Sequence, residues 1–243
     1  MTDITKGHTV HKYDEELGAA RGMALEMGKQ VLDQVRKAVS ALGEGNTDLA
    51  REVVDNERRI DCFELDIDET IFDLIATRQP LGCDLRLILA LSKVAGDLER
   101  AGDKAARIAW CVTRLMERTE RPPSSKILHH IRSLDRVARS LLERSLDACA
   151  RVDVDLALDV FADGSRLDDE LDAAMRHVMT FVLEDTQLVG QVLDLVFVLR
   201  ALANIGDHAG SIAEQVVFVA KGKDVRYQDK EILVDALRER GGR

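Results

Sequence analysis

The chain has 243 residues, enough for one large domain or two small ones, and it carries a formal net charge of −10. An acidic chain repels nucleic-acid phosphates, and no basic cluster with interleaved aromatic residues is present, so the composition argues against a nucleic-acid-binding protein. Aromatic residues make up only 4% and prolines number three, which is typical of long helices rather than sheets. The four cysteines include no CxxC pair, so neither a zinc knuckle nor a redox pair is indicated.

Helical periodicity runs through almost the whole chain and predicts six helices. We expect them over 13–42, 47–77 and 84–117, from the linker 121–125 to 150, from 153 to 183, and from the turn 184–187 to 220. Thr47 and Asp153 are the expected N-caps of the second and fifth helices, and Pro80 with Gly82 separates the second from the third. The tail to 243 is expected to be a short appended helix or disordered.

The N-terminal segment lacks the apolar run of a signal peptide, and no stretch approaches 18 uninterrupted apolar residues. We therefore expect a cytoplasmic protein.

One sequence segment, which we call the repeated phrase, occurs twice in the chain. Residues 97–109 read DLERAGDKAARIA and residues 201–213 read ALANIGDHAGSIA, with Gly102-Asp103 matching Gly206-Asp207. Upstream matches, such as 48–50 with 155–157, are offset by 107 positions rather than 104. A duplicated unit with a variable connection explains both offsets. Long helices joined by short turns then predict an all-α fold of two pseudo-symmetric three-helix bundles, with domains at 1–120 and 121–243.

Acidic residues interrupt the apolar seam of the second predicted helix. Glu57 and Glu64 occupy seam positions, and Asp61 and Asp68 lie beside them on the same side of the helix. The corresponding seam of the second copy is apolar, so the glutamates of the first copy need an explanation.

The third predicted helix offers a matching pair, Glu99 and Asp103, four residues apart and close to small residues. If the two helices are neighbours, Glu64 and Asp68 face this pair, and four carboxylates so close together stay ionised only around a cation. Oxygen ligands suit magnesium, calcium, manganese or iron. The alternative is a solvated acidic face paired with nearby arginines such as Arg100.

The second copy offers fewer carboxylates. Ala203 replaces the equivalent of Glu99, and Leu171 replaces that of Glu64, while three aspartates remain: Asp168, Asp172 and Asp207. His208 follows Asp207 and could support or ligate a metal there.

No catalytic motif is apparent in the sequence. There is no HExxH, P-loop or GxGxxG, and no Glu lies three residues before a His, so the Glu-x-x-His of di-iron bundles is missing.

These residues resemble the PhoU family of regulators of bacterial phosphate uptake and phosphate-starvation signalling. The resemblance spans essentially the whole chain and is strongest at 76–80 with 84–86, at 97–103, and at 205–208 with 212–214. It implies two pseudo-symmetric three-helix bundles and, as in some members, metal clusters held by Glu/Asp-x-x-x-Asp pairs. The pairs Glu64–Asp68, Glu99–Asp103 and Asp168–Asp172 fit that pattern. Where the family usually has Glu-Arg-Ile-Gly-Asp, this chain has Ala203-Asn204-Ile205-Gly206-Asp207, which predicts a lost or weakened second site.

The resemblance also implies a function. The protein is expected to be an adaptor rather than an enzyme, which damps the phosphate-starvation response and restrains phosphate uptake. Its expected partners are a sensor histidine kinase and the ATPase of the phosphate ABC transporter, together with a second copy in a homodimer, and it would meet the membrane only through them. The expected metals are iron, zinc, manganese, magnesium or calcium. The alternatives are a carboxylate-bridged metal-binding helical-bundle enzyme and a metal-free scaffold.

Overall fold

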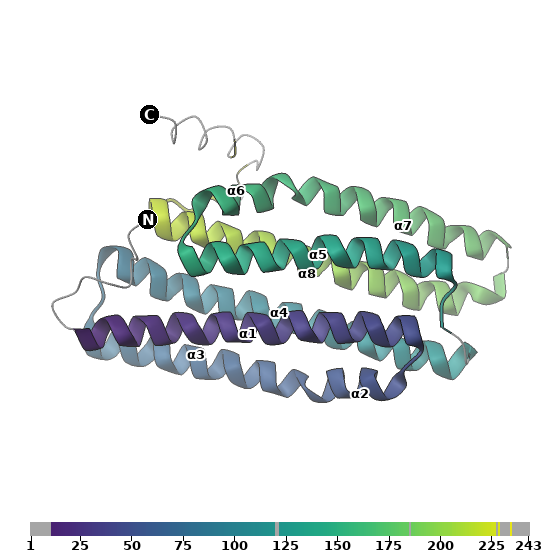
Figure 1. Ribbon diagram of the computed structural model, residues 1–243, viewed down its shortest axis with the longest axis horizontal. Coiled ribbons are helices and arrows are strands. Elements are labelled where there is room, and N and C mark those ends of the chain that lie inside the picture. Colours follow the sequence, from purple (N-terminus) through teal and green to yellow (C-terminus); the bar gives the residue numbers. More distant parts are fainter. Residues whose placement is uncertain (1–10, 120–121, 185, 227, 229–233, 235–243) are drawn as a thin grey trace.

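The computed structural model describes residues 11–119, 122–184, 186–226, 228 and 234, and the regular elements among them are all helices (Figure 1). In chain order they are α1 (His11–Glu44), α2 (Thr47–Asp55), α3 (Glu57–Arg78), α4 (Gly82–Thr119), α5 (Ser125–Arg151), α6 (Val154–Ala162), α7 (Gly164–Glu184), the 3₁₀ turn η1 (Thr186–Leu188) and α8 (Val189–Lys221). Most of the predicted C-terminal tail and part of the predicted linker lie outside the described residues.

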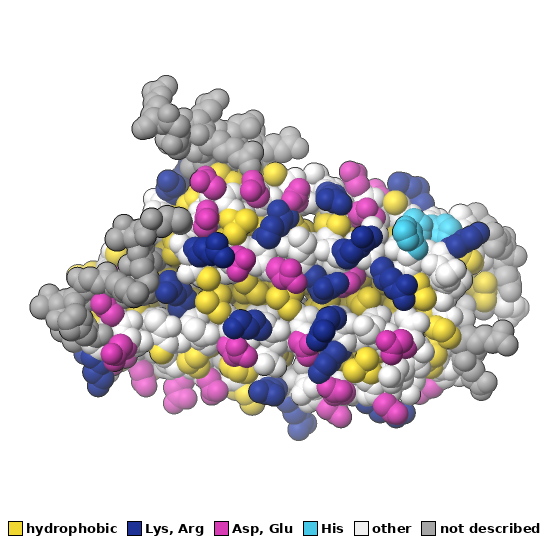
Figure 2. All heavy atoms as spheres, viewed as in Figure 1, with side chains coloured by type: hydrophobic (Ala, Val, Ile, Leu, Met, Phe, Trp, Pro, Cys, Tyr) yellow, Lys and Arg dark blue, Asp and Glu magenta, His cyan; other side chains and the backbone are white. Residues whose placement is uncertain are grey.

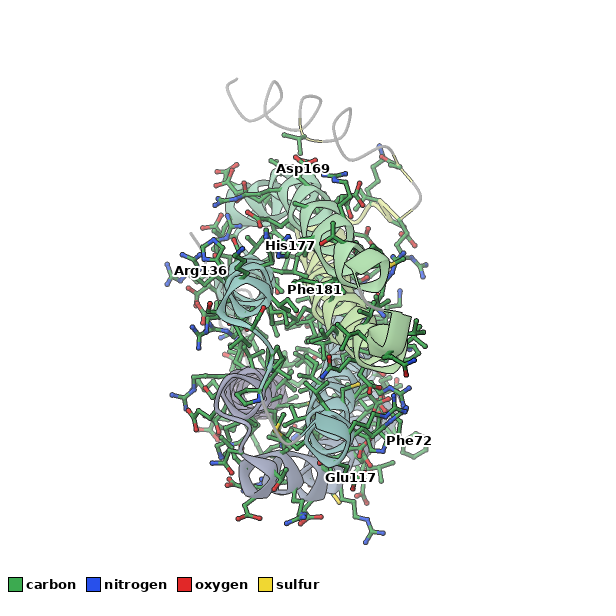
Figure 3. The ribbon with its side chains drawn as sticks, turned by 90° about the vertical axis from the view of Figure 1, so that its right-hand side faces the viewer. Phe72, Glu117, Arg136, Asp169, His177 and Phe181 are labelled. Carbon is green, nitrogen blue, oxygen red and sulfur yellow. The ribbon has the colours of Figure 1, made fainter. Side chains whose placement is uncertain are left out.

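The helices form two bundles stacked on one another. α1, α4 and the α2–α3 pair make one bundle, and α5, α8 and the α6–α7 pair make the other, with the long helices running along a common axis (Figures 1 and 3). α4 and α8 share the most extensive contact in the described structure, so the two cores are continuous across the boundary between the halves. The predicted all-α fold of two pseudo-symmetric three-helix bundles is confirmed.

Two of the six predicted helices are each divided in two, and on this point the prediction was wrong. The second helix bends at Asn56 and the fifth at Asp163, which separate α2 from α3 and α6 from α7. Both residues keep helical dihedral angles, and their N–H groups still donate to the carbonyls of Glu52 and Asp159 four residues earlier. The chain therefore bends without leaving the helical region, and apolar periodicity does not detect such a bend.

The first residues of α2 and α6 are fixed by side-chain caps. Asn46, not the predicted Thr47, caps α2, because its Oδ1 accepts a hydrogen bond of 3.0 Å from the Leu49 N–H. Asp153 caps α6 as predicted, accepting 3.1 Å from the Leu156 N–H.

The offset of 107 residues relates the first helices of the two halves as well. From Ala20 onward, each buried position of α1 has a buried counterpart in α5, as in the pairs Ala24/Ile131 and Val31/Ala138. The caps at 46 and 153 and the bends at 56 and 163 obey the same offset. Equivalent positions in the two halves can therefore be compared residue by residue.

α8 is apolar enough, and long enough, to pass for a membrane-spanning helix by composition. Its most apolar 18-residue window has a mean hydropathy of 1.5, but 56% of that window is buried inside the protein. α8 packs against α4, α5 and α7, so its central position in the fold explains its apolar character.

Candidate metal centre

Three carboxyl groups converge where α3 packs on α4. Asp61 of α3 and Glu99 and Asp103 of α4 each offer an oxygen, and these oxygens lie within 4.8 Å of one another. All three residues are half-buried. A set of oxygen donors with partial access to solvent suits a hard cation such as magnesium, calcium or manganese, or iron. The donors present therefore fit the predicted kind of metal.

Glycines of α4 allow α3 to come this close. A Cβ placed on Gly102 would lie 3.1 Å from Cγ2 of Ile60, and one placed on Gly96 would lie 3.3 Å from Oε1 of Glu64. Any larger residue at either position would push the helices apart or displace the side chain opposite. Gly102, within the repeated phrase, and Gly96, just before it, thus help to hold the acidic groups together.

Three glutamates in and beside the cluster are unfavourably placed for ionisation. Burial, and then the neighbouring carboxylates, raise the pKa of Glu57, Glu64 and Glu99. For Glu57 the largest contribution after burial is the hydrogen bond that it shares with Asp103. Arg100 lowers the pKa of Glu64 and Glu99, but its effect is smaller than that of burial and of the nearest carboxylate. Pairing with arginine therefore compensates this cluster only in part.

The structure distributes the predicted first-half residues over two neighbouring places. Glu64 borders the cluster of Asp61, Glu99 and Asp103 and also lines a second pocket together with Asp68. Asp68 lies farther along α3, where its Oδ1 accepts a hydrogen bond of 2.7 Å from Ser92 Oγ. Asp61 thus stands nearer the α4 pair than Asp68 does. As a ligand set these residues stay a prediction.

Glu57 borders the cluster too, although it was not among the predicted site residues. Its seam position on the second predicted helix was the available signal, since an apolar residue would be expected there.

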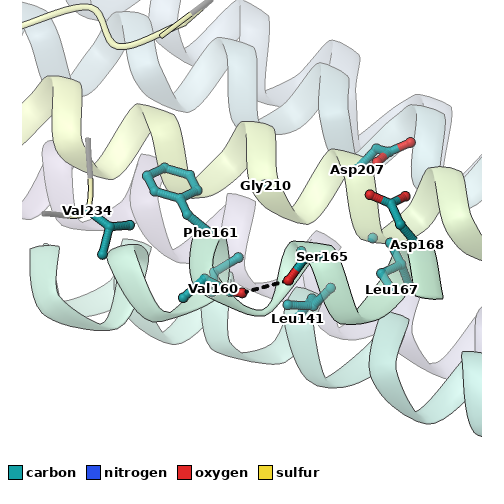
Figure 4. A pocket seen from close by; sticks show the side chains of 12 residues that line it. Leu141, Val160, Phe161, Ser165, Leu167, Asp168, Asp207, Gly210 and Val234 are labelled. Atoms are coloured by element: carbon teal, nitrogen blue, oxygen red, sulfur yellow. Dashed lines mark hydrogen bonds between the residues drawn. The ribbon is translucent and has the colours of Figure 1, made fainter. Parts of the chain in front are cut away.

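The second half brings together two of its three predicted aspartates. Asp168 and Asp207 line a pocket of about 520 Å³ that is bordered by α5, α6, α7 and α8 (Figure 4). Asp172 does not line this pocket and is exposed, at the position equivalent to Leu65. Ala203 is buried where the first half has Glu99. Among the described residues, no group of three acids forms here, so the donor set is smaller than in the first half.

His208 turns toward the other half. Its Nδ1 lies 3.1 Å from Oδ1 of Asp97 on α4. The imidazole therefore joins α8 to α4, and the predicted role beside Asp207 stays untested.

Comparisons with known proteins agree with the two-fold repeat. The family model described as PhoU domain matches residues 24–112 and again residues 131–216. A Phosphate-specific transport system accessory protein PhoU homolog of Pseudomonas aeruginosa is 38% identical over 225 residues, 93% of this chain and 92% of the relative. The Phosphate-specific transport system accessory protein PhoU of Escherichia coli K12 is 32% identical over 220 residues, 90% of each chain.

Solved structures give the same result. The crystal structure of PhoU from Pseudomonas aeruginosa superposes with a TM-score of 0.80 at 38% identity, covering 87% of this chain and all of that one. A second crystal structure, of the phosphate transport system regulatory protein PhoU from Streptococcus pneumoniae, is 22% identical and supports the fold. It superposes with a TM-score of 0.79, covering 87% of this chain and 98% of that one. With both halves matched by the family model and curated relatives aligned along nearly their full length, the chain belongs to the PhoU family.

Proposed function

We propose that this protein is an accessory regulator of a phosphate-specific transport system, and that it damps the phosphate-starvation response and restrains uptake when phosphate is plentiful. In this proposal it is an adaptor without a catalytic step, acting in the cytoplasm. It couples the transporter ATPase to a sensor histidine kinase. The observation that carries the proposal is the near-full-length similarity to proteins named as accessories of phosphate-specific transport.

Exposed apolar side chains at equivalent places in the two halves support an adaptor. Phe72 of α3 is 71% exposed, and its counterpart 107 positions later, Met179 of α7, is 50% exposed. Leu89 of α4 and Leu193 of α8, 104 positions apart, are 42% and 51% exposed. Phe72 projects outward from the lower bundle in Figure 3. Large apolar groups left in water at repeated positions suit docking to partner proteins, whether the kinase, the ATPase or a second copy.

We also propose that the cluster of Asp61, Glu99 and Asp103 holds a metal ion with a structural or regulatory role. A cation there would neutralise the mutual repulsion of the carboxylates and tie α3 to α4. Since Phe72 lies on the same α3, metal binding in this proposal also stabilises the surface offered to a partner.

The test is a phosphate-starvation reporter, such as alkaline phosphatase, in a deletion strain grown with excess phosphate. We expect high reporter output that the wild-type gene silences and that a Phe72→Asp variant fails to silence. Ala19→Asp is the matched control, because it adds the same charge at an exposed position of α1. A reporter that stays silent in the deletion strain would refute the regulatory role and favour a metalloenzyme or a scaffold.

A further inference from the structure

An arginine-lined pocket lies on the second half, away from the carboxylate cluster. It has a volume of about 370 Å³ and sits between α5 and the bend that separates α6 from α7. Its lining consists of Ser133, Arg136, Val137, Ser140, Arg144, Asp163 and Arg166. Figure 3 shows Arg136 projecting from α5 to the outside of the bundle, and Figure 2 shows lysines and arginines, with acidic side chains among them, over α1 and α5 on this side. We call this the arginine pocket.

The arginine pocket is positive in an acidic protein. It holds three guanidinium groups and one carboxylate, and that carboxylate, Asp163, pairs with Arg144 at 2.7 Å. Within the described part of the chain, neither Arg136 nor Arg166 pairs with a carboxylate, and the Nε of Arg136 donates only to the Arg132 carbonyl at 3.4 Å. The guanidinium groups of Arg136 and Arg166 therefore line the pocket as two positive charges without a carboxylate partner.

The equivalent place in the first half is neutralised. At the offset of 107, the positions of Arg136, Arg144 and Arg166 are occupied by Lys29, Lys37 and Arg59. There the cations have acidic neighbours.

Those acidic neighbours are Glu26 and Asp33 of α1 and Glu52 of α2, which lies 2.7 Å from Lys37. Lys29 lies 3.5 Å from Glu26, and Lys37 lies 3.1 Å from Asp33. The counterparts of Glu26 and Asp33 are Ser133 and Ser140, which line the arginine pocket, whereas Glu52 corresponds to Asp159, which does not line it. The second half thus keeps all three cations of the repeat and replaces two carboxylates by hydroxyl groups.

Guanidinium forks and hydroxyl donors are the groups that recognise a tetrahedral oxyanion, because together they supply charge and several hydrogen bonds directed at its oxygens. We propose that the arginine pocket binds a phosphoryl dianion, either free inorganic phosphate or the phosphate of a mononucleotide. Arg136 and Arg166 supply the charge, and Ser133 and Ser140 donate hydrogen bonds. The assignment goes beyond the adaptor role and rests on the residues of the pocket alone.

Isothermal titration calorimetry on the full chain tests the assignment, with inorganic phosphate in one series, AMP in a second, and chloride at matched ionic strength as the blank. Saturable binding of either probe is expected, and the tighter of the two identifies the source of the phosphoryl group. We expect Arg136→Gln combined with Arg166→Gln to weaken that binding by at least about tenfold. Arg59→Gln, at the position equivalent to Arg166, is the matched control and should leave it unchanged.

A second variant restores the acids of the first half. Ser133→Glu with Ser140→Asp changes one half-buried and one exposed residue, so the fold should tolerate it, and it should abolish binding by neutralising the pocket. The absence of saturable binding of both probes would overturn the proposal, as would binding that all the pocket variants retain. Neither result depends on the reporter experiment, so the two proposals fail separately.

Discussion

The carboxyl groups of Glu57, Glu64 and Glu99 have pKa values raised by burial and by one another. A carboxyl group with a raised pKa keeps its proton up to a higher pH in the folded protein than in the unfolded protein. Its contribution to stability is therefore present at low pH and is lost as the pH rises from the ordinary value of 4.5 through the raised folded value. At neutral pH without a cation, these three ionised glutamates therefore destabilise the fold.

Replacing Glu99 by Gln should relieve this repulsion. Without metal, we expect Glu99→Gln to be more stable than wild type at pH 7 by about 0.5–1 kcal/mol, a modest gain because half-buried carboxylates keep part of their hydration. The difference should shrink as the pH falls toward 4.5, where the wild-type groups are protonated. Urea denaturation in chelator across this pH range measures it.

Metal addition reverses the comparison. With manganese or magnesium present, wild type should gain stability and Glu99→Gln should gain much less, since one ligand oxygen is lost. Glu69→Gln removes an exposed carboxylate of α3 outside the cluster and should behave as wild type under both conditions. An equal metal response in all three proteins would show that these carboxylates are not ligands.

Periodicity could predict which side of α3 is acidic, but not which acids meet α4. Asp61, Glu64 and Asp68 share one side of the helix, and the register between the two helices selects among them. That register depends on contacts such as Ile60 against Gly102, which join residues far apart in the chain. Local sequence therefore identified the residues and not their grouping.

At the scale of elements, the length and order of the helices followed from apolar spacing and turn residues, whereas the bends at Asn56 and Asp163 did not. Both residues have helical dihedral angles, and although Gly164 directly follows Asp163, no glycine or proline adjoins Asn56. The close approach of paired helices is a second feature that spacing leaves open, and glycines reveal it. A Cβ on Gly206 of α8 would lie 2.3 Å from Cδ2 of Leu167 on α7, whereas one on Gly22 of α1 would meet nothing within 4 Å.

These two glycines should respond oppositely to the same substitution. Gly22→Ala is expected to stabilise the protein by about 0.5–1 kcal/mol, because alanine costs less backbone entropy in a helix. Gly206→Ala gains the same helix propensity, but the new methyl group must displace the buried Leu167. Overpacking of this kind costs about 1–3 kcal/mol, so the net change should be destabilising. Thermal unfolding followed by circular dichroism compares them. A stabilised Gly206→Ala would mean that α7 moves away from α8 at little cost.

At the scale of the whole molecule, the repeated phrase predicted the duplication, but nothing in it predicted that α4 would pack on α8. In each half, the long helix (α4 or α8) needs one apolar stripe to pack within its own bundle and another to pack on the other half. Apolar periodicity does not distinguish these two stripes. A fully buried carboxylate lies at this junction. Asp194 of α8 is 1% exposed and lies 3.5 Å from Arg114 and 3.7 Å from Arg118 of α4. Within the described structure, its carboxylate oxygens accept no hydrogen bond.

Removing the buried acid and removing its two arginines should have different effects on stability. Burial of Asp194 removes its carboxylate from water, which costs free energy. Arg114 and Arg118 offset that cost only in part, because their side chains lie at these distances and are themselves 32% and 44% exposed. Asp194→Leu should therefore be neutral or stabilising in urea denaturation. Arg114→Met with Arg118→Met should cost at least about 2 kcal/mol, because it leaves a buried carboxylate without a counter-charge. Adding Asp194→Leu to that double variant should recover most of the loss. Equal destabilisation by Asp194→Leu alone would show instead that the charge pair itself holds the two halves together.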